Sequence, residues 1–549
     1  MFIGYNLQPY DSPLRRAKTS IIAGPLGAIS ELANPKTRIA RTTTALFAPI
    51  ATLAVWYAIS WLRSPLRKYP GPFWAGFTNL WRLSQSVFWP DEYADTIKKL
   101  HEKYGPVLRI GPNTLDLDYP ELLKVIYTTD GKWVKTEMYD NNSTMMDGQQ
   151  VWTIFSTRDQ AYHARVKRSI VKYFTLASAL NLEPHMDVEI GDFVKHLDDR
   201  FAADVQSPKE FDLVEWINYF AWDQASTMTF SKRYGYMDAG RDFDGTLLVS
   251  EKTFNYFQVV SQMPWLDSVL DKNPIVSIGP PNMQEASRLA AEAYAARVAG
   301  EDKSYDPGRP DYMQHFLDSK RTHPDLVDDK IVMTYLIVNI IAAADTTAIT
   351  LQAIFYHLMK HPRAQRRVVQ QVRSQAWDKD EVVPYARARH LDYLEAVIKE
   401  SRRLHPVLGY CLERYVPKDG SGLALPDGSV VPAGTGVGLN AYVIGRNKGL
   451  FGEDAEEFRP ERWLRQDGEG EEAYKTRMHR MNAADFGFGA GSRVCLGRHL
   501  ATVEVYKVVA TLLNRYDMEL VDPEREWKVA KGFFMRPKHG LMTRFTVRD

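Results

Sequence analysis

One cysteine near the C-terminus stands in a glycine-rich loop whose residue types could hold a metal. Phe488, Gly491, Arg493, Cys495 and Gly497 form the pattern Phe-x-x-Gly-x-Arg-x-Cys-x-Gly. Flanking glycines allow a tight turn that directs amide hydrogens at the sulfur, and a neighbouring arginine and a helix N-terminus favour the thiolate. The alternative is a glycine-rich turn around a buried cysteine, but so many fixed positions make chance agreement improbable. We therefore predict that Cys495 is a functional cysteine biased toward its thiolate, which could act as a nucleophile or as a metal ligand.

Composition narrows the class of protein. The chain has 549 residues, 45% hydrophobic and 25% charged, with a formal net charge of +1. It can bury a large core, and it has no global positive field that would attract nucleic acid. Its only other cysteine is Cys411. Two cysteines are too few for a disulfide framework or a Cys-x-x-Cys zinc site.

Two further charged motifs precede the cysteine loop. Glu400 and Arg403 lie one helical turn apart in a Glu-x-x-Arg pattern, and Arg462 follows in a Pro-Glu-Arg segment. Asp345 and Thr346 follow a run without charge from residue 331 to 344. Taken alone, Glu400 and Arg403 would be a solvated surface pair, and Thr346 an ordinary hydroxyl bonding back to its own helix. An acid in so apolar a helix is costly unless it is paired or functional.

Together, and in this order, these segments resemble the cytochromes P450, and the resemblance covers the chain from about residue 69 onward. It implies haem b as the cofactor, with Cys495 as the axial thiolate ligand. It also implies that Phe488 packs near the sulfur, that Gly491 belongs to the haem-binding loop and that Arg493 reaches a haem propionate.

The same resemblance assigns roles to the other motifs. Asp345 and Thr346 would be the acid–alcohol pair that relays protons above the haem. Glu400, Arg403 and Arg462 would form a buried charge network that supports the haem pocket. The chain departs from the family at Ala343, where glycine is common.

Three more haem-binding candidates rest on position alone. His163 and Lys167 lie one turn apart on a predicted helix, where the family usually supplies groups to a propionate, although tryptophan often replaces His163. Without the resemblance they would be a solvated basic face. Arg414, shortly after the Glu-x-x-Arg motif, is a further propionate candidate.

Periodicity predicts a mainly α-helical fold with minor β-sheets, in one large haem-binding domain. Two sheets are expected: a hairpin of 107–110 and 114–117, and another between 412 and 438. The predicted helices span residues 91–104, 158–180, 184–201, 284–298, 328–360, 362–377, 393–404 and 499–513.

A membrane anchor is expected ahead of this domain. Residues 42–62 carry no charge and nearly reach the roughly 20 residues that span a bilayer. We divide the chain into an N-terminal extension (1–41), a transmembrane anchor (42–62), a basic, proline-containing hinge (63–72) and the haem-thiolate domain (73–549). A signal peptide is disfavoured, because the run starts late and no clear cleavage site follows it.

Charge counting and family topology disagree on orientation. More basic residues precede the span than follow it, which favours a cytosolic N-terminus. A reductase partner instead requires the catalytic domain to face the cytosol. We give the functional requirement more weight and expect a single-pass protein of the endoplasmic reticulum.

The predicted activity is insertion of one oxygen atom from dioxygen into a lipophilic small molecule. No Gly-x-Gly-x-x-Gly fingerprint follows a predicted strand, so a separate NADPH-cytochrome P450 reductase would supply electrons, with cytochrome b5 as a second candidate donor. Phrases such as 155–159 and 261–266 resemble fungal microsomal members of the pisatin demethylase group, used in secondary metabolism and detoxification. The segments expected to face substrate are 138–155, 253–265, 342–347, 407–412 and 532–535.

Several rival functions stay open. A xenobiotic-detoxifying monooxygenase would share every motif. A dioxygen-independent isomerase or dehydratase would not need Asp345 and Thr346. A non-catalytic haem sensor, or a membrane-tethered interaction protein without haem, would lack turnover with a reductase.

Overall fold

The computed structural model describes residues 35–146, 148–202, 207–276, 278–280 and 284–548. The chain divides into two units, residues 1–63 and residues 64–549. In the first unit, helix α2 (Pro35–Arg63) contains the predicted anchor segment. The N-terminal extension up to residue 34 lies outside the described residues.

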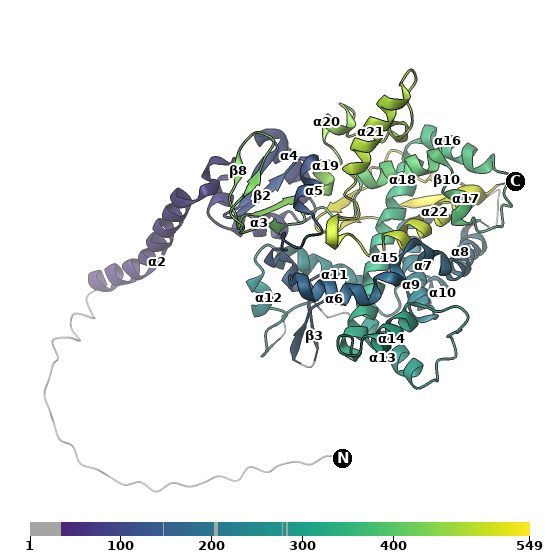
Figure 1. The fold of residues 1–549 in the computed structure, drawn as a ribbon, viewed down its shortest axis with the longest axis horizontal. Coiled ribbons are helices and arrows are strands. Elements are labelled where there is room, and N and C mark those ends of the chain that lie inside the picture. Colours follow the sequence, from purple (N-terminus) through teal and green to yellow (C-terminus); the bar gives the residue numbers. More distant parts are fainter. Residues whose placement is uncertain (1–34, 147, 203–206, 277, 281–283, 549) are drawn as a thin grey trace, which may run out of the picture. The chain divides into compact units, whose positions relative to one another are not determined.

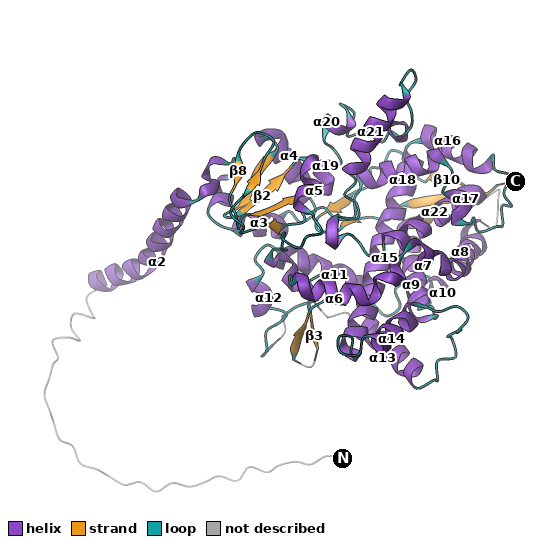
Figure 2. Cartoon of the chain, viewed as in Figure 1, coloured by secondary structure: helices purple, strands orange, loops and turns teal. Residues whose placement is uncertain are grey.

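The second unit is mainly helical with small sheets, as predicted (Figure 2). Its helices are α3 (Leu80–Phe88), α4 (Tyr93–Tyr104), α5 (Leu123–Ile126), α6 (Gln160–Ile170), α7 (Leu176–Asn181), α8 (Glu183–Leu197), α9 (Leu213–Phe230), α10 (Tyr236–Ala239), α11 (Thr246–Val260), α12 (Trp265–Val269), α13 (Gln284–Val298), α14 (Tyr312–Thr322), α15 (Asp329–Lys360), α16 (Pro362–Arg373), α17 (Tyr385–Ala388), α18 (Asp392–Leu404), α19 (Ala441–Ile444), α20 (Lys448–Phe451), α21 (Glu471–Ala483) and α22 (Arg498–Arg515). Its strands are β1 (Val107–Gly111), β2 (Thr114–Leu117), β3 (Thr144–Met146), β4 (Gln149–Val151), β5 (Phe211–Asp212), β6 (Arg414–Tyr415), β7 (Leu423–Ala424), β8 (Val430–Val431), β9 (Gly436–Leu439), β10 (Tyr516–Leu520), β11 (Val529–Lys531), β12 (Met535–Pro537) and β13 (Met542–Val547).

The predicted hairpin and part of the second predicted sheet form one sheet in the structure, while β7 and β8, also between 412 and 438, pair separately. The predicted hairpin is β1 and β2, which pair antiparallel. Strand β9 joins β2 in parallel and β6 pairs antiparallel with β9, which gives the order β1-β2-β9-β6. The sheet lies apart from the helical bundle that surrounds α15 (Figure 1). Segments far apart in the sequence therefore share one small sheet.

Helix α15 is the central element of the bundle. It begins at a predicted boundary, where the Asp328 side chain caps it by accepting from the Ile331 amide at 2.8 Å. Among the residues that the structure describes, α15 is the one helix long and apolar enough to cross a membrane, but half of that apolar window is buried in the fold. Its hydrophobicity is therefore that of a core helix.

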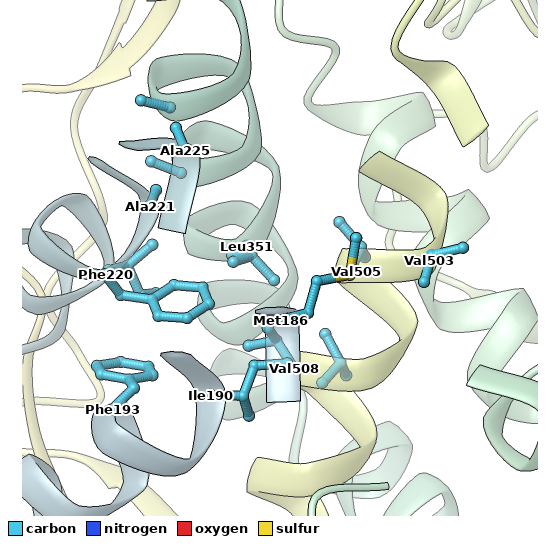
Figure 3. Packing of buried hydrophobic residues seen from close by; sticks show 14 of the residues in the cluster. Met186, Ile190, Phe193, Phe220, Ala221, Ala225, Leu351, Val503, Val505 and Val508 are labelled. Carbon is cyan, nitrogen blue, oxygen red and sulfur yellow. The ribbon is translucent and has the colours of Figure 1, made fainter. Parts of the chain in front are cut away.

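Helices α8, α9 and α22 pack around α15. Phe193 of α8 stacks on Phe220 of α9 with ring centroids 4.8 Å apart, and Leu351 of α15 and Val508 of α22 are buried beside them (Figure 3). The core thus fixes α15 against α22, the helix that directly follows the cysteine loop.

One predicted helix is interrupted. The continuous helix expected over 158–180 forms α6, a 3-10 turn (Val171–Phe174) and α7. Thr175 is extended and caps α7 by accepting from the Ser178 amide, so the local hydrogen bond of a threonine side chain replaces a helical one.

Candidate functional site

The cysteine loop forms a tight turn that packs against Tyr127 and Thr128, the two residues that follow α5. The Cys495 amide donates to the Phe488 carbonyl at 2.8 Å, and the Ser492 amide donates to the Thr128 carbonyl at 3.1 Å. Gly491 has φ +67°, and a Cβ there would lie 2.2 Å from the Tyr127 carbonyl oxygen. Only glycine fits both the conformation and the close approach, so Gly491 seats the loop on this segment.

The Cys495 thiol opens into a cavity of about 1040 Å³. Desolvation raises the pKa of the thiol, while the Gly497 amide and the guanidinium groups of Arg498 and Arg402 lower it by a smaller amount. The cavity walls are built from the segments that the sequence analysis expected to face a ligand, since the lining includes Tyr139, Met145, Thr253, Phe254, Ala342, Val407, Leu408, Phe533 and Phe534.

The cavity brings together most of the predicted site residues. Those that line it are Cys495, Phe488, Arg493, His163, Lys167, Arg414 and Thr346. Gly491 and Asp345, both within the described chain, do not line it, and neither do Glu400, Arg403 and Arg462.

A group of cationic side chains surrounds His163 at one wall of the cavity. Burial, then the charges of Arg493, Lys167, Lys135 and Arg414, lower the pKa of His163 to about 3. Within the described residues, no ion pair joins any of these groups to a carboxylate. Asp159 raises the pKa of Arg493, but by less than burial and Arg414 lower it. This cationic cluster therefore carries excess positive charge, a costly arrangement unless an anion binds there.

Two arginines of this cluster, Arg493 and Arg414, keep part of their hydrogen-bonding capacity or charge unused. Burial and then repulsion from Arg414 lower the pKa of Arg493 to about 10, and its Nε is buried with no hydrogen-bond partner among the described residues. Arg414 is fixed by donating to Tyr139 Oη at 3.0 Å and to the Glu413 carbonyl at 2.8 Å. Both side chains keep donors or charge available for an anionic ligand.

Lys135 is a site residue that the sequence analysis did not identify. Its side chain lines the cavity and donates to the Phe155 carbonyl. Its backbone pairs with that of Arg414 in an isolated antiparallel β-bridge. Burial, then Arg414 and Arg493, lower its pKa well below the ordinary value. Nothing in the sequence distinguishes Lys135 from a surface lysine, because its neighbours in space come from a distant strand.

Thr346 and Asp345 face different surroundings although they are adjacent on α15. Thr346 lines the cavity and donates to the Ala342 carbonyl at 2.6 Å. Asp345 is buried behind it, where its carboxylate accepts from Arg536 at 2.8 Å, from Trp222 at 3.3 Å and from the Ser250 hydroxyl. No motif indicated this ion pair, because its partners are 191 residues apart.

The Glu-x-x-Arg network is complete and fully buried. Glu400 has no exposed surface and accepts from Arg403 at 2.7 and 2.8 Å and from Arg462 at 2.7 Å. Its carboxylate also accepts from the Trp463 indole and from the Arg459 amide, both at 2.9 Å. Burial would raise the pKa of Glu400, but Arg403 and Arg462 outweigh it and lower the pKa overall. The three side chains thus form one buried network of ion pairs and hydrogen bonds.

This network joins the end of α18 to the segment before α21. Arg403 also donates to the Ala455 carbonyl at 2.6 Å, and Arg462 donates to the Phe451 carbonyl at 2.6 Å. Every charge is thus paired and most guanidinium donors are used, which a buried ion network requires.

Comparison with known proteins gives a consistent family. Residues 70–544 match the cytochrome P450 family. Cytochrome P450 monooxygenase cfoH of Aspergillus candidus is 43% identical over 517 residues, covering 93% of this chain and 94% of that protein. A cytochrome P450 monooxygenase of Aspergillus terreus is 34% identical over 84% of this chain and 92% of its own. Cytochrome P450 monooxygenase cicH of Emericella nidulans is 32% identical over 89% and 94%.

Proposed function

The chain belongs to the cytochrome P450 family of monooxygenases, and from this premise we propose that it oxygenates a lipophilic small molecule in fungal secondary metabolism. The observation that carries the proposal is that one cavity joins the Cys495 thiol, the cationic cluster and a wall rich in aromatic side chains. The fungal relatives support the metabolic setting.

The family binds haem through a cysteine thiolate, and the residues present here fit that group. Haem carries two propionates, and the cationic cluster of Lys135, His163, Arg414 and Arg493 supplies buried positive charge together with the unpartnered Nε of Arg493. We propose that Arg493, Arg414 and Lys135 hold the propionates, with His163 as a neutral hydrogen-bonding group. Lys167 donates to the Ser492 carbonyl at 2.8 Å, so we assign it to holding the cysteine loop as well.

Cys495 would hold the haem through its thiolate, and the bound haem would supply dioxygen activation, with one oxygen atom entering the substrate and the other leaving as water. Phe488 lines the same cavity, with the guanidinium of Arg402 4.3 Å from its ring centroid, and we propose that it packs near the sulfur. Gly491 lets the loop approach Tyr127 closely, so its contribution to binding acts through the loop backbone.

Thr346 and Asp345 are proposed to deliver protons to the cavity. The Thr346 hydroxyl faces the cavity, and Asp345 is the adjacent acid on the same helix. Because Asp345 is bound to Arg536, the acid must exchange partners before it can pass a proton to the cavity. Arg536 therefore holds the acid in its resting position.

A spectrum tests the haem assignment. The reduced carbon monoxide complex of the purified protein should absorb at the red-shifted position typical of thiolate-ligated haem. Cys495→Ala should lose activity, and Cys495→His should retain haem without the thiolate spectrum. Cys411→Ala is the matched control, because Cys411 lies buried outside the cavity lining. A histidine-type spectrum in fresh wild-type protein would overturn the proposal.

Product yield per NADPH tests the proton relay. Thr346→Ala should consume NADPH at a similar rate but release more of it as peroxide, because the hydroxyl supports proton delivery. Asp345→Asn should slow turnover instead. Thr350→Ala is the control, since Thr350 also lines the cavity from α15 and donates only to the Thr346 carbonyl. Unchanged coupling in Thr346→Ala would count against the relay.

The electron source and the membrane anchor are part of the same proposal. We propose electron supply from NADPH-cytochrome P450 reductase, with cytochrome b5 as a possible second donor. Helix α2 supports an anchor in the endoplasmic reticulum membrane, because Phe47, Ile50, Leu53, Trp56 and Ile59 are all exposed and apolar. The catalytic unit would then face the cytosol.

Protease protection tests the orientation. In sealed microsomes, added protease should digest the catalytic unit and spare a tag placed at Met1. Protection of the catalytic unit would show the opposite topology. Comparison of metabolites before and after gene deletion tests the biosynthetic role, and loss of xenobiotic clearance without a metabolite change would favour detoxification.

A further inference from the structure

One buried ion pair lies where the cavity reaches the surface. Lys272, which follows α12, pairs with Asp267 of α12, and their side chains are only 8% and 5% exposed. The cavity lining at this end includes Asn141, Met145, Tyr256, Phe257 and Lys272. Met145 is 42% exposed, so this end of the cavity borders the surface.

Lys272 joins two segments that face each other across this end of the cavity. Besides Asp267, its ammonium group donates to the carbonyls of Asp140 at 3.3 Å and Asn141 at 3.2 Å, in the 3-10 turn Glu137–Asn142. A lysine has three N–H donors, and all three are used here. Figure 1 shows α11, α12 and β3 in this part of the fold.

Each side of this contact is anchored to a rigid element. Asp267 also accepts from Tyr256 Oη of α11 at 2.8 Å. On the opposite side, Asp140 accepts from Arg158 at 2.9 Å, just before α6. A second, weaker link is the Asn141 amide, which donates to the Phe257 carbonyl at 3.2 Å. Movement of either segment away from the other must therefore break the Lys272 contacts.

We propose that Lys272 is a specificity-determining residue that controls which ligands enter the cavity, by latching the turn 137–142 to the α11–α12 segment. Small ligands pass while the latch is closed. Bulky ligands require the ammonium group to leave the two carbonyls, so their entry and release are limited by the opening of the latch. Lys272 acts on passage and does not take part in the chemistry.

The test compares ligand sizes in the haem-loaded, full-length protein. Stopped-flow absorbance would follow the binding of imidazole and of a triphenylmethyl-substituted imidazole. In Lys272→Met, entry and release of the bulky azole should each become about tenfold faster, as expected for loss of about 1.4 kcal/mol of latch energy. Imidazole rates should stay unchanged, and the bulky azole's Kd should change little, because both rates shift together.

Matched variants separate the latch from general effects. Lys320→Met removes a lysine from an exposed pair with Asp329 and should leave every rate unchanged. Tyr256→Phe removes one hydrogen bond from Asp267 and should give a smaller acceleration. Lys272→Arg keeps the charge and should leave the bulky-azole rates close to those of the wild type. If Lys272→Met does not fold, the acceleration in Tyr256→Phe carries the test. Unchanged bulky-azole rates, or equal acceleration of imidazole, would overturn the proposal.

Hydrogen exchange provides a readout that needs no turnover. In Lys272→Met, backbone amides of residues 137–142 and 256–272 should exchange faster than in the wild type, while those of α15 should not. Unchanged exchange in both segments would overturn the latch. The latch rests on the proposed ligand-binding role of the cavity, but failure of that role would appear separately, as absence of any azole spectrum in the wild type.

Discussion

Two charged clusters in this protein contain similar residues but differ in their charge balance. In the Glu400 network, Glu400 pairs with Arg403 and Arg462 and accepts from an indole, and Asp454 supplies the second negative charge by pairing with Arg462. In the cationic cluster, Lys135, Arg414 and Arg493 crowd around a neutral His163 without a carboxylate among the described partners. The first cluster is complete by itself, whereas the second would be completed by the anionic ligand that we propose.

The difference separates a structural role from a binding role. A buried charge that lacks a counter-ion costs free energy in the ligand-free protein, and that cost is recovered only when the ligand binds. Removing a charge from the complete network should therefore harm folding. Removing one from the cationic cluster should harm haem retention while relieving the ligand-free fold.

The largest effect is expected from the complete network. Glu400→Gln leaves Arg403 buried without a counter-ion and Arg462 with Asp454 alone, which should lower the free energy of unfolding by about 3–5 kcal/mol. Urea denaturation would measure the loss, together with the yield of haem-loaded protein. Glu285→Gln, in an exposed pair with Arg288, is the control and should behave as wild type. Normal stability of Glu400→Gln would remove the contrast between the clusters.

In the haem-free protein, removing a charge from the cationic cluster should raise the free energy of unfolding. Lys135→Met removes one of the repelling charges, so we expect the haem-free protein to resist urea better than wild type. Haem should dissociate about tenfold faster, equivalent to about 1.4 kcal/mol, measured by its transfer to an acceptor protein. Lys132→Met, on an exposed lysine nearby, is the control. Destabilisation of the haem-free variant would contradict the excess positive charge of the cluster.

The pH dependence of the haem-free protein should report the same repulsion. His163 has a pKa of about 3 in the folded protein, against about 6.5 in an unfolded chain. Between these two pH values the unfolded state therefore binds a proton that the folded state does not bind. The free energy of unfolding falls as pH falls from about 6.5 toward 3. At pH 5 the loss attributable to His163 is about 2 kcal/mol.

Denaturation of wild type and His163→Gln between pH 7 and pH 4, approximately, would measure this difference. The variant should lose the His163 contribution to the slope. In the haem-loaded protein the slope should be shallower, because propionates would offset the surrounding cations. Equal slopes in wild type and variant would show that His163 is not shielded from protonation.

The smallest effect is expected from the edge of the complete network. Trp463→Phe removes the indole donor to Glu400 Oε2, but that oxygen still accepts from Arg403 at 2.8 Å. Because the carboxylate keeps its charged partners, the loss should be about 1 kcal/mol, far below that of Glu400→Gln. Thermal denaturation would rank the two. A loss as large as that of Glu400→Gln would indicate that the indole, and not charge balance, decides the stability of the network.

The sequence predicted the local parts of the fold well. Helix α15 begins as predicted because capping by Asp328 and the apolar run after it are properties of consecutive residues. The hairpin of β1 and β2 is local in the same sense. The joining of this hairpin to β9 and β6 was missed, because strand pairing across distant segments leaves no periodic signal in either segment.

The sequence was sufficient to assign the chemistry of short motifs. The cysteine loop and Glu400 with Arg403 are fixed by spacing within a turn or a helix, where neighbours in sequence are neighbours in space. Tertiary structure alone decided that Lys135 stands beside Arg414, that Arg536 binds Asp345 and that Lys272 links α12 to the turn 137–142. These contacts depend on how separate elements pack, and buried charges acquire their partners and their pKa shifts only when packing removes water from around them.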